Sequence, residues 1–304
     1  MTHAQPQKKS FFNMNVDLMH GPILKSLLLF MLPILVSNLF QQLYNTVDTM
    51  IVGNVLGDTA LAAIGSCGSI YELLVGFGIG IGNGLAIVAA RSYGAQDEDL
   101  LKRTVTGSIV IGLIASLVIT AAGFLGLRPL LQLLDTPAEI LEEAYSYIIV
   151  IDLGVIVMFL YNLCAGLLRA IGNSVMPLVF LLISSALNVG LDLAFILVFR
   201  WGVAGAALAT VLAQLVSTIG CFIYAFVRYP VLRLHREDWR ITLMDVKRHL
   251  ARGIPLGLQF SVLAVGIIVM QGGVVKFDMR DGVMVSNAAQ NGFGAANRLF
   301  NLVA

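Results

Sequence analysis

Long runs of hydrophobic residues, separated by short polar segments, dominate the pattern along this chain. A helix needs about 20 apolar residues to cross roughly 30 Å of hydrocarbon, whereas a tilted barrel strand needs only about 10. The runs are continuous and do not alternate, so they predict helices. We expect eight spans, at residues 26–52, 59–90, 105–127, 144–168, 177–198, 203–227, 254–275 and 283–304. The sequence thus predicts an all-α integral membrane protein, folded as a polytopic helical bundle.

The second span carries glycine at alternate positions, namely Gly76, Gly78, Gly80, Gly82 and Gly84. This spacing produces two faces of small residues four positions apart, and such faces let membrane helices approach closely. We therefore expect neighbouring helices to pack tightly against this span.

Lys and Arg are unevenly divided between the connecting segments. With the N-terminus inside, the inner segments carry fourteen and the outer ones four, with Arg298 left inside the last span. Because cytoplasmic loops carry the excess of positive charge, this count places the N-terminus in the cytoplasm of a protein of the inner (plasma) membrane. The one long connection, 228–252, alternates basic and apolar residues around Trp239, which predicts an amphipathic linker on the inner surface.

This linker divides the chain into unequal parts. Pro33 and Pro255 each stand early in a span, one on either side of the linker, as in duplicated transporter halves. The chain also ends inside an apolar run, so we expect it to be incomplete at its C-terminus. The predicted organisation is a cytoplasmic segment 1–25, an N-lobe of six helices at 26–227, the linker 228–252, and the first two helices of a C-lobe at 253–304.

The composition supports this class and excludes others. Of 304 residues, 58% are hydrophobic and 12% are charged, which is about half the charge of a soluble domain. The net charge of +1 gives no reason to expect a nucleic-acid partner. The three cysteines lie in apolar runs without metal-ligand spacing, and the four histidines lie in polar connecting stretches, so no enzyme site and no cofactor is expected.

Acidic residues inside the spans are the strongest functional signal, because charges in the membrane are costly and rare. Asp48, Asp192 and Asp152 lie about 6, 9 and 12 Å below the outer ends of their spans, and Glu72 lies about 20 Å deep. An unpaired buried carboxylate takes up a proton or binds a cation. We therefore expect an ion-coupling site at Asp48 and Asp192, and a Na+ ion, if one is used, would bind there.

Two polar stripes accompany these acids. Asn38, Gln41, Asn45 and Asp48 share one helical face with Tyr44 alongside, and Ser184, Asn188 and Asp192 share another. Lipid cannot solvate such stripes, so they predict a shared cavity. The alternative is that the amides and hydroxyls only hydrogen-bond helices together. No phosphate-binding loop or hydrolase motif is found, so energy coupling must come from an ion gradient.

Several short motifs, in this order and spacing, resemble the multidrug and toxic compound extrusion (MATE) family. They are Gly21-Pro22, Pro33 with Asp48 fifteen residues later, the run Asp48-Thr-Met-Ile-Val-Gly53, the loop Arg91-Ser-Tyr-Gly94-Ala, the turn Leu168-Arg-Ala-Ile-Gly172-Asn173 before Pro177, the Asn188 and Asp192 pair, and Gly202-Val-Ala-Gly205-Ala-Ala. The resemblance covers about residues 20–304.

The resemblance implies a MATE-like fold of the MOP superfamily, with twelve helices in two lobes, and export of organic cations driven by H+ or Na+. It assigns the cation site to Asp48, Asn188 and Asp192, adds Gln41, Tyr147, Asn162 and Thr210 to the cavity, and makes Pro33 a hinge. The cavity candidates predicted from sequence are Gln41, Tyr44, Asn45, Tyr147, Asp152, Asn162 and Thr210. Two departures are the missing spans of the second lobe and the lack of a carboxylate between Pro255 and Gln271.

We expect a monomeric antiporter that exchanges small organic cations or drugs for H+ or Na+. Membrane lipids are its expected surroundings and contacts. A lipid-linked oligosaccharide flippase of the same superfamily is one alternative, although it predicts basic residues in the cavity that the first six spans lack. A membrane enzyme would need converging His, Cys or paired acids near an interface. An inactive fragment is a third alternative.

Overall fold

The computed structural model describes residues 16, 22–134, 136–280 and 283–284. Seven of its helices are long and apolar enough to cross a membrane in the described part of the chain. They are α1 (Ile23–Leu56), α2 (Asp58–Gly94), α3 (Glu98–Leu133), α4 (Ala138–Ala170), α5 (Val175–Asp192), α6 (Gly202–Arg228) and α7 (Leu243–Asp278). The predicted all-α membrane fold is thus confirmed there, apart from one short hairpin.

That hairpin pairs β1 (Met279–Arg280) with β2 (Val283–Met284) in antiparallel register. The eighth span was expected to begin at Val283, so its start is wrong: the first two of its residues form a strand. The remainder of that span, 285–304, lies outside the described residues, as does most of the N-terminal segment 1–25.

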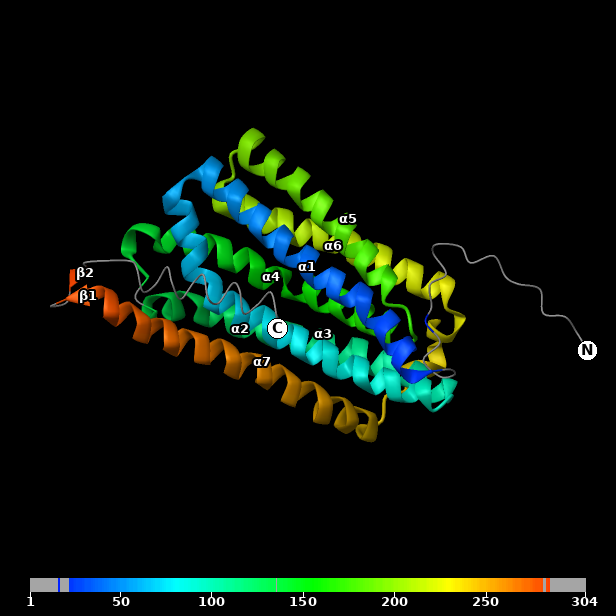
Figure 1. Cartoon of the computed structure of the whole chain (residues 1–304). Coiled ribbons are helices and arrows are strands. Elements are labelled where there is room, and N and C mark those ends of the chain that lie inside the picture. Colours follow the sequence, from blue (N-terminus) through cyan, green and yellow to red (C-terminus); the bar gives the residue numbers. More distant parts are fainter. Residues whose placement is uncertain (1–15, 17–21, 135, 281–282, 285–304) are drawn as a thin grey trace, which may run out of the picture.

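The helices lie roughly parallel in a bundle with α2 and α4 at its centre (Figure 1). α3 and α6 pack on α4, and α5 packs on α6. α1 lies against α5 and α2, while α7 runs along α2 and α3 on the other side of the bundle (Figure 1). Buried side chains concentrate on α2 and α4, whereas α1 exposes most of its leucines, as expected where lipid is the solvent.

Most helices extend beyond the predicted apolar windows, and a side-chain cap is found at the polar start of α3. The side chain of Asp97, for example, accepts a hydrogen bond from the backbone N–H of Leu100 at the start of α3. The largest difference concerns the linker. Its first part forms the short 3-10 helices η2 (Pro230–Leu232) and η3 (Arg236–Trp239), but from Leu243 onward it already belongs to α7. His249 therefore lies in a helix, where it is buried, rather than in a polar connection.

α5 changes character at Asp192. The expected α-helix 177–198 is instead an α-helix that ends at Asp192, followed by the π-helix η1 (Leu193–Val198). A π-helix adds a residue to the turn and so changes the direction in which side chains point, and such segments are frequent at functional sites.

The glycines of α2 confirm the predicted close packing on both faces. A Cβ atom placed on Gly80 or Gly84 would lie 2.6 Å from the carbonyl oxygen of Leu256 or Arg252 on α7. On the other face, Gly78 and Gly82 lie against α4. α7 thus approaches the backbone of α2 at a distance that only glycine permits.

Replacing Gly80 or Gly84 with alanine should push α7 away from α2, because the new methyl group would overlap backbone atoms. We expect a loss of about 1–3 kcal/mol of stability, measured by thermal unfolding in detergent. Gly65→Ala is the matched control, since a Cβ at that position of α2 meets nothing within 4 Å. Equal stability of Gly80→Ala and Gly65→Ala would contradict the close approach.

Candidate functional site

The acids of α1 and α5 meet inside the first six helices. The Asp48 and Asp192 side chains lie within hydrogen-bonding reach of each other. Asp192 is fully buried, and Asp48 is half-buried on the side of α1 that faces α5. The structure therefore brings together the two residues on which the sequence argument placed the most weight.

This pair cannot be stable as two isolated charges. Two carboxylates are both hydrogen-bond acceptors, so a hydrogen bond between them requires a proton. Four buried oxygens here have no partner among the described residues: Asp48 Oδ1, Asn188 Oδ1, Asp192 Oδ1 and Asp192 Oδ2. In a low-dielectric interior such oxygens need a proton or a cation. The arrangement can thus bind one small positive ion.

A hydroxyl and amide network surrounds the acids. Asn188 Nδ2 donates to Thr210 Oγ1 at 3.2 Å, which ties α5 to α6. The Tyr44 side chain lies near Thr210 and both acids. The Tyr147 ring lies near Asp48 and Tyr44 as well. Tyr44, Tyr147 and Thr210 thus lie in the surroundings of the acid pair, and Asn188 is tied to them through Thr210.

Other predicted residues lie elsewhere. The first polar stripe divides, because Asp48 and Tyr44 turn toward α5 while Asn38, Gln41 and Asn45 are exposed. Asn162 donates its amide to Met158 O on its own helix and lies beside Gly82 of α2. Pro33 lies within a continuous α1, where its carbonyl accepts a hydrogen bond from Ser37 at 2.8 Å.

Asp152 is placed between α3 and α4, not beside the Asp48 and Asp192 pair. Its carboxyl group fills the space over Gly123 of α3, where an added Cβ would lie within 2.6 Å of Oδ2. Thr120 Oγ1 donates to the Asp152 backbone carbonyl at 3.0 Å. The side chain is fully buried, and neither of its oxygens has a partner among the described residues. Its predicted depth was close to that of the other acids, but depth along a helix does not define which neighbour a side chain faces.

Sequence reasoning missed two members of this region. Tyr71 of α2 lies near Asp48 and Tyr44, and a single aromatic residue within a long apolar span gave no signal. Gln214 of α6 accepts a hydrogen bond from Ser184 at 3.3 Å, one turn along from the Asn188 and Thr210 pair. A search for polar residues spaced four apart on the sixth span would have found Thr210 with Gln214. The Ser184–Gln214 and Asn188–Thr210 hydrogen bonds also support the alternative, in which some polar residues only hold α5 and α6 together.

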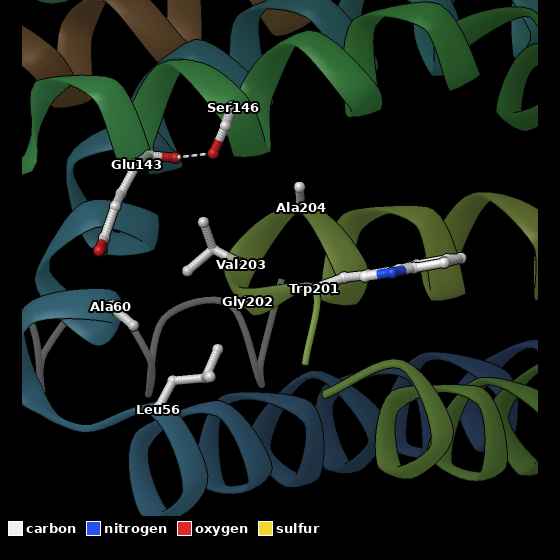
Figure 2. A pocket seen from close by; sticks show the side chains of 8 residues that line it. All are labelled: Leu56, Ala60, Glu143, Ser146, Trp201, Gly202, Val203 and Ala204. Carbon is white, nitrogen blue, oxygen red and sulfur yellow. Dashed lines mark hydrogen bonds between the residues drawn. The ribbon is translucent and has the colours of Figure 1, made fainter. Parts of the chain in front are cut away.

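A pocket of about 220 Å³ opens at the end of the bundle where α1 turns into α2. Figure 2 shows Glu143 reaching from α4 toward Ala60, with Val203 and Leu56 on the other walls. On α1, Val52 lies one turn before Leu56 and Asp48 lies two turns before it. Val52 belongs to a buried apolar cluster with Ile196 and Ala206, and this cluster also includes Ala60 and Val203 of the pocket wall.

A helical bundle of long apolar helices with a buried acid pair defines a multi-pass membrane protein. The chain belongs to the MatE family, whose model matches residues 33–194. It is 31% identical over 291 residues to the probable multidrug resistance protein YpnP of Bacillus subtilis (strain 168), covering 94% of this chain and 62% of that protein. The chain thus spans between 45% and 62% of the length of such curated relatives.

The fold agrees with solved structures of MATE. A crystal structure of MATE in the straight conformation matches 94% of this chain and 62% of that chain, with a TM-score of 0.82 and 25% identity. A crystal structure of MATE in the bent conformation matches 94% of this chain and 64% of that chain, with a TM-score of 0.81 and 24% identity. The family and fold implied by the sequence motifs are therefore confirmed.

Thr210→Val should weaken the contact between α5 and α6, because it removes the hydroxyl that accepts the Asn188 hydrogen bond without changing the side-chain shape. We expect a loss of about 0.5–1.5 kcal/mol in thermal unfolding. Combined with Asn188→Ala, the effects should be less than additive, since both variants remove the same hydrogen bond.

The control is Thr46→Val on the exposed part of α1, where the hydroxyl only contacts the Gln42 carbonyl of the same helix. Strict additivity of the Thr210 and Asn188 variants would show that their hydrogen bond contributes nothing.

Proposed function

We propose that this protein is a secondary active transporter that exports small organic cations or drugs in exchange for H+ or Na+. The observation that carries the proposal is the contact between Asp48 and Asp192, with four buried oxygens that lack partners among the described residues. In support, relatives of the chain are named as multidrug resistance proteins. Because the chain spans only part of the length of those relatives, the transport activity belongs to the proposal.

The coupling follows from charge neutralisation. With a proton or Na+ bound, the acid pair carries less negative charge and attracts an organic cation less strongly. Release of the ion restores the charge and with it the attraction. Two ligands that compete for one negative site lower each other's affinity by the same factor, which is the condition for exchange. Whether the coupling ion is H+ or Na+ depends on how many oxygens contact it. Na+ needs several oxygen ligands, whereas a proton needs only one or two.

Pro33 supplies a way for α1 to move. Proline has no N–H, so its turn of α1 lacks one backbone hydrogen bond, and bending there costs less than elsewhere. Asp48 stands fifteen residues further along the helix. A bend at Pro33 would therefore move Asp48 relative to Asp192, which is fixed on α5. The existence of straight and bent conformations of a MATE structure fits such a motion.

The membrane topology is part of the proposal. An excess of Lys and Arg on one side assigns the N-terminus and the linker to the cytoplasm of the plasma membrane. The pocket beside Glu143 and Ala60 then opens to the outside, two helical turns from Asp48. In this arrangement the coupling ion enters through the pocket and passes the apolar cluster at Val52.

Asp48→Asn should abolish exchange, because asparagine has the same shape but cannot release a charge. The full-length protein is reconstituted in liposomes, and efflux of a fluorescent organic cation is driven by an imposed pH gradient without Na+ or by a Na+ gradient at equal pH. We expect the wild type to respond to one of these gradients, and Asp48→Asn and Asp192→Asn to fall to the level of empty liposomes.

Asp152→Asn is the matched control, since Asp152 is also buried and unpaired but lies at the contact of α3 and α4. It should keep the coupled efflux. Coupled efflux by Asp48→Asn at the wild-type rate would refute the role of the pair, as would a complete loss confined to Asp152→Asn.

A further inference from the structure

A cavity of about 320 Å³ lies between α3 and α7, with α2 at its back. The two helices are joined near their starts, where Arg103 Nη2 of α3 lies 2.6 Å from Asp245 Oδ2 of α7. Further along, α7 packs on the glycines of α2, and a Cβ on Gly80 would lie 2.6 Å from the carbonyl oxygen of Leu256. The cavity therefore occupies a wedge between α3 and α7 on the outer side of the bundle, where α7 lies (Figure 1).

This cavity is apolar and opens to the surface of the bundle. Three side chains of α2 line its back: Phe77, Ile81 and Leu85. On α3 its rim includes Ile114 and Val118, which are 57% and 63% exposed. On α7 the rim includes Leu250 and Ile254, which are 40% and 42% exposed. In a membrane these exposed rim residues face the acyl chains of lipids, so the cavity is open to lipid.

Water does not suit this space. A bound water needs two or more polar partners, and His249 supplies the only polar side chain among the described lining residues. Its ring nitrogens already lie 2.6 and 3.0 Å from the backbone carbonyl oxygens of Asp245 and Thr104. An empty apolar cavity would forfeit dispersion contacts along its whole lining. An acyl chain is the membrane component that fills an apolar cavity of this shape.

A lysine stands on the same face of α7 as the rim. Lys247, Leu250 and Ile254 are spaced three and four residues apart, so they share one side of the helix. Lys247 is exposed and has no ion-pair partner among the described residues. It comes one turn before Leu250, on the side of the helix start. A flexible stem with a terminal ammonium suits the phosphate of a lipid whose chain lies beside Leu250 and Ile254.

The residues before α7 place this lysine near the surface of the membrane. Trp239 is 49% exposed, and Leu243 and Met244 are 85% and 58% exposed. Exposed tryptophan next to apolar residues is typical of the level of the lipid headgroups. Lys247 lies four residues after Leu243, which is about 6 Å further along the helix axis. The ammonium is therefore at phosphate depth, and the cavity lies below it in the hydrocarbon.

The charges around the start of α7 favour an anion. Arg248 and Arg252 are also exposed, and neither has an ion-pair partner among the described residues. The acid at this end of α7 is Asp245, which is already paired with Arg103. The positive charge of Lys247 is thus not cancelled by a neighbouring acid of its own helix. A headgroup with a net negative charge fits better than a zwitterionic one.

We propose that the cavity between α3 and α7, together with Lys247, binds an anionic phospholipid of the leaflet in which these helices begin. One acyl chain fills the cavity, and the phosphate pairs with the Lys247 ammonium. The lipid then lies between a helix of the six-helix bundle and the first helix after the linker. This site is separate from the acid pair and does not rest on the proposed exchange of ions and drugs.

The test measures the binding of defined lipids to the full-length protein in detergent. Native mass spectrometry gives the affinity for dioleoyl-phosphatidylglycerol and for dioleoyl-phosphatidylcholine, which have the same chains but differ in net charge. We expect the wild type to bind the anionic lipid about fivefold more tightly, as one basic residue near the headgroup should give. Glycerol phosphate, which has the charge without the chains, should not compete.

Two substitutions separate the headgroup contact from the chain contact. Lys247→Gln should remove the preference for the anionic lipid and leave the affinity for phosphatidylcholine unchanged. Its matched control is Arg248→Gln, which removes the same charge from the side of α7 facing away from Leu250 and Ile254 and should keep the preference. Ala115→Phe should fill the cavity and weaken both lipids. Ala121→Phe, at an exposed position of α3 outside the cavity lining, should weaken neither.

Several results would overturn the proposal. Equal wild-type affinities for the two lipids would exclude recognition of the charge. An equal loss in Arg248→Gln and Lys247→Gln would show diffuse attraction to a basic surface. Unchanged lipid binding by Ala115→Phe would show that no acyl chain occupies the cavity, as when another part of the full-length chain covers it. Lys247→Gln changes only an exposed side chain, so this arm remains decisive if Ala115→Phe does not fold. None of these outcomes bears on the acid pair.

Discussion

The cost of placing a carboxylate where water is scarce governs the centre of this protein. In the proposed function, Asp48 and Asp192 reduce that cost by sharing a neutralising ion, because the described helices around them supply hydroxyl and amide groups but no basic side chain in contact with the pair. Asn188 donates to Thr210 beside the pair, Tyr44 lies near both acids, and the π-helix begins directly after Asp192. A site that must be neutralised is a site at which ion binding can be linked to a second, competing ligand.

Close backbone contact is the second constraint, and it determines where α7 can lie. Membrane helices gain no hydrophobic free energy by leaving lipid for one another, so packing depends on small residues that allow close approach. Gly80 and Gly84 let the carbonyl groups of Leu256 and Arg252 approach α2 directly. This contact fixes α7 beside α3, and only then can Arg103 meet Asp245 and His249 meet the Thr104 carbonyl.

The buried titratable groups differ in their surroundings. In the proposed exchange, a proton bound at the acid pair removes charge and weakens the attraction for an organic cation. The His249 ring lies between the backbone carbonyl oxygens of Asp245 and Thr104, at the contact of α7 with α3. The Asp152 carboxyl group illustrates a third outcome, in which a buried acid fills a notch over Gly123 between α3 and α4. Burial of a titratable group therefore does not define its function; its neighbours do.

The sequence by itself determined the helices, the small-residue faces of α2 and the polar faces of α1 and α5, because hydrophobic periodicity and residue spacing are local properties of the chain. It could not determine lateral neighbours. That Asp48 meets Asp192 while Asp152 faces Gly123, that Asn38, Gln41 and Asn45 turn outward, and that His249 is buried in a helix rather than lying in a loop were decided by the packing of helices distant in sequence. A helix fixes the depth and direction of each side chain about its own axis, but only its contacts with other helices set the rotation of that axis in the bundle.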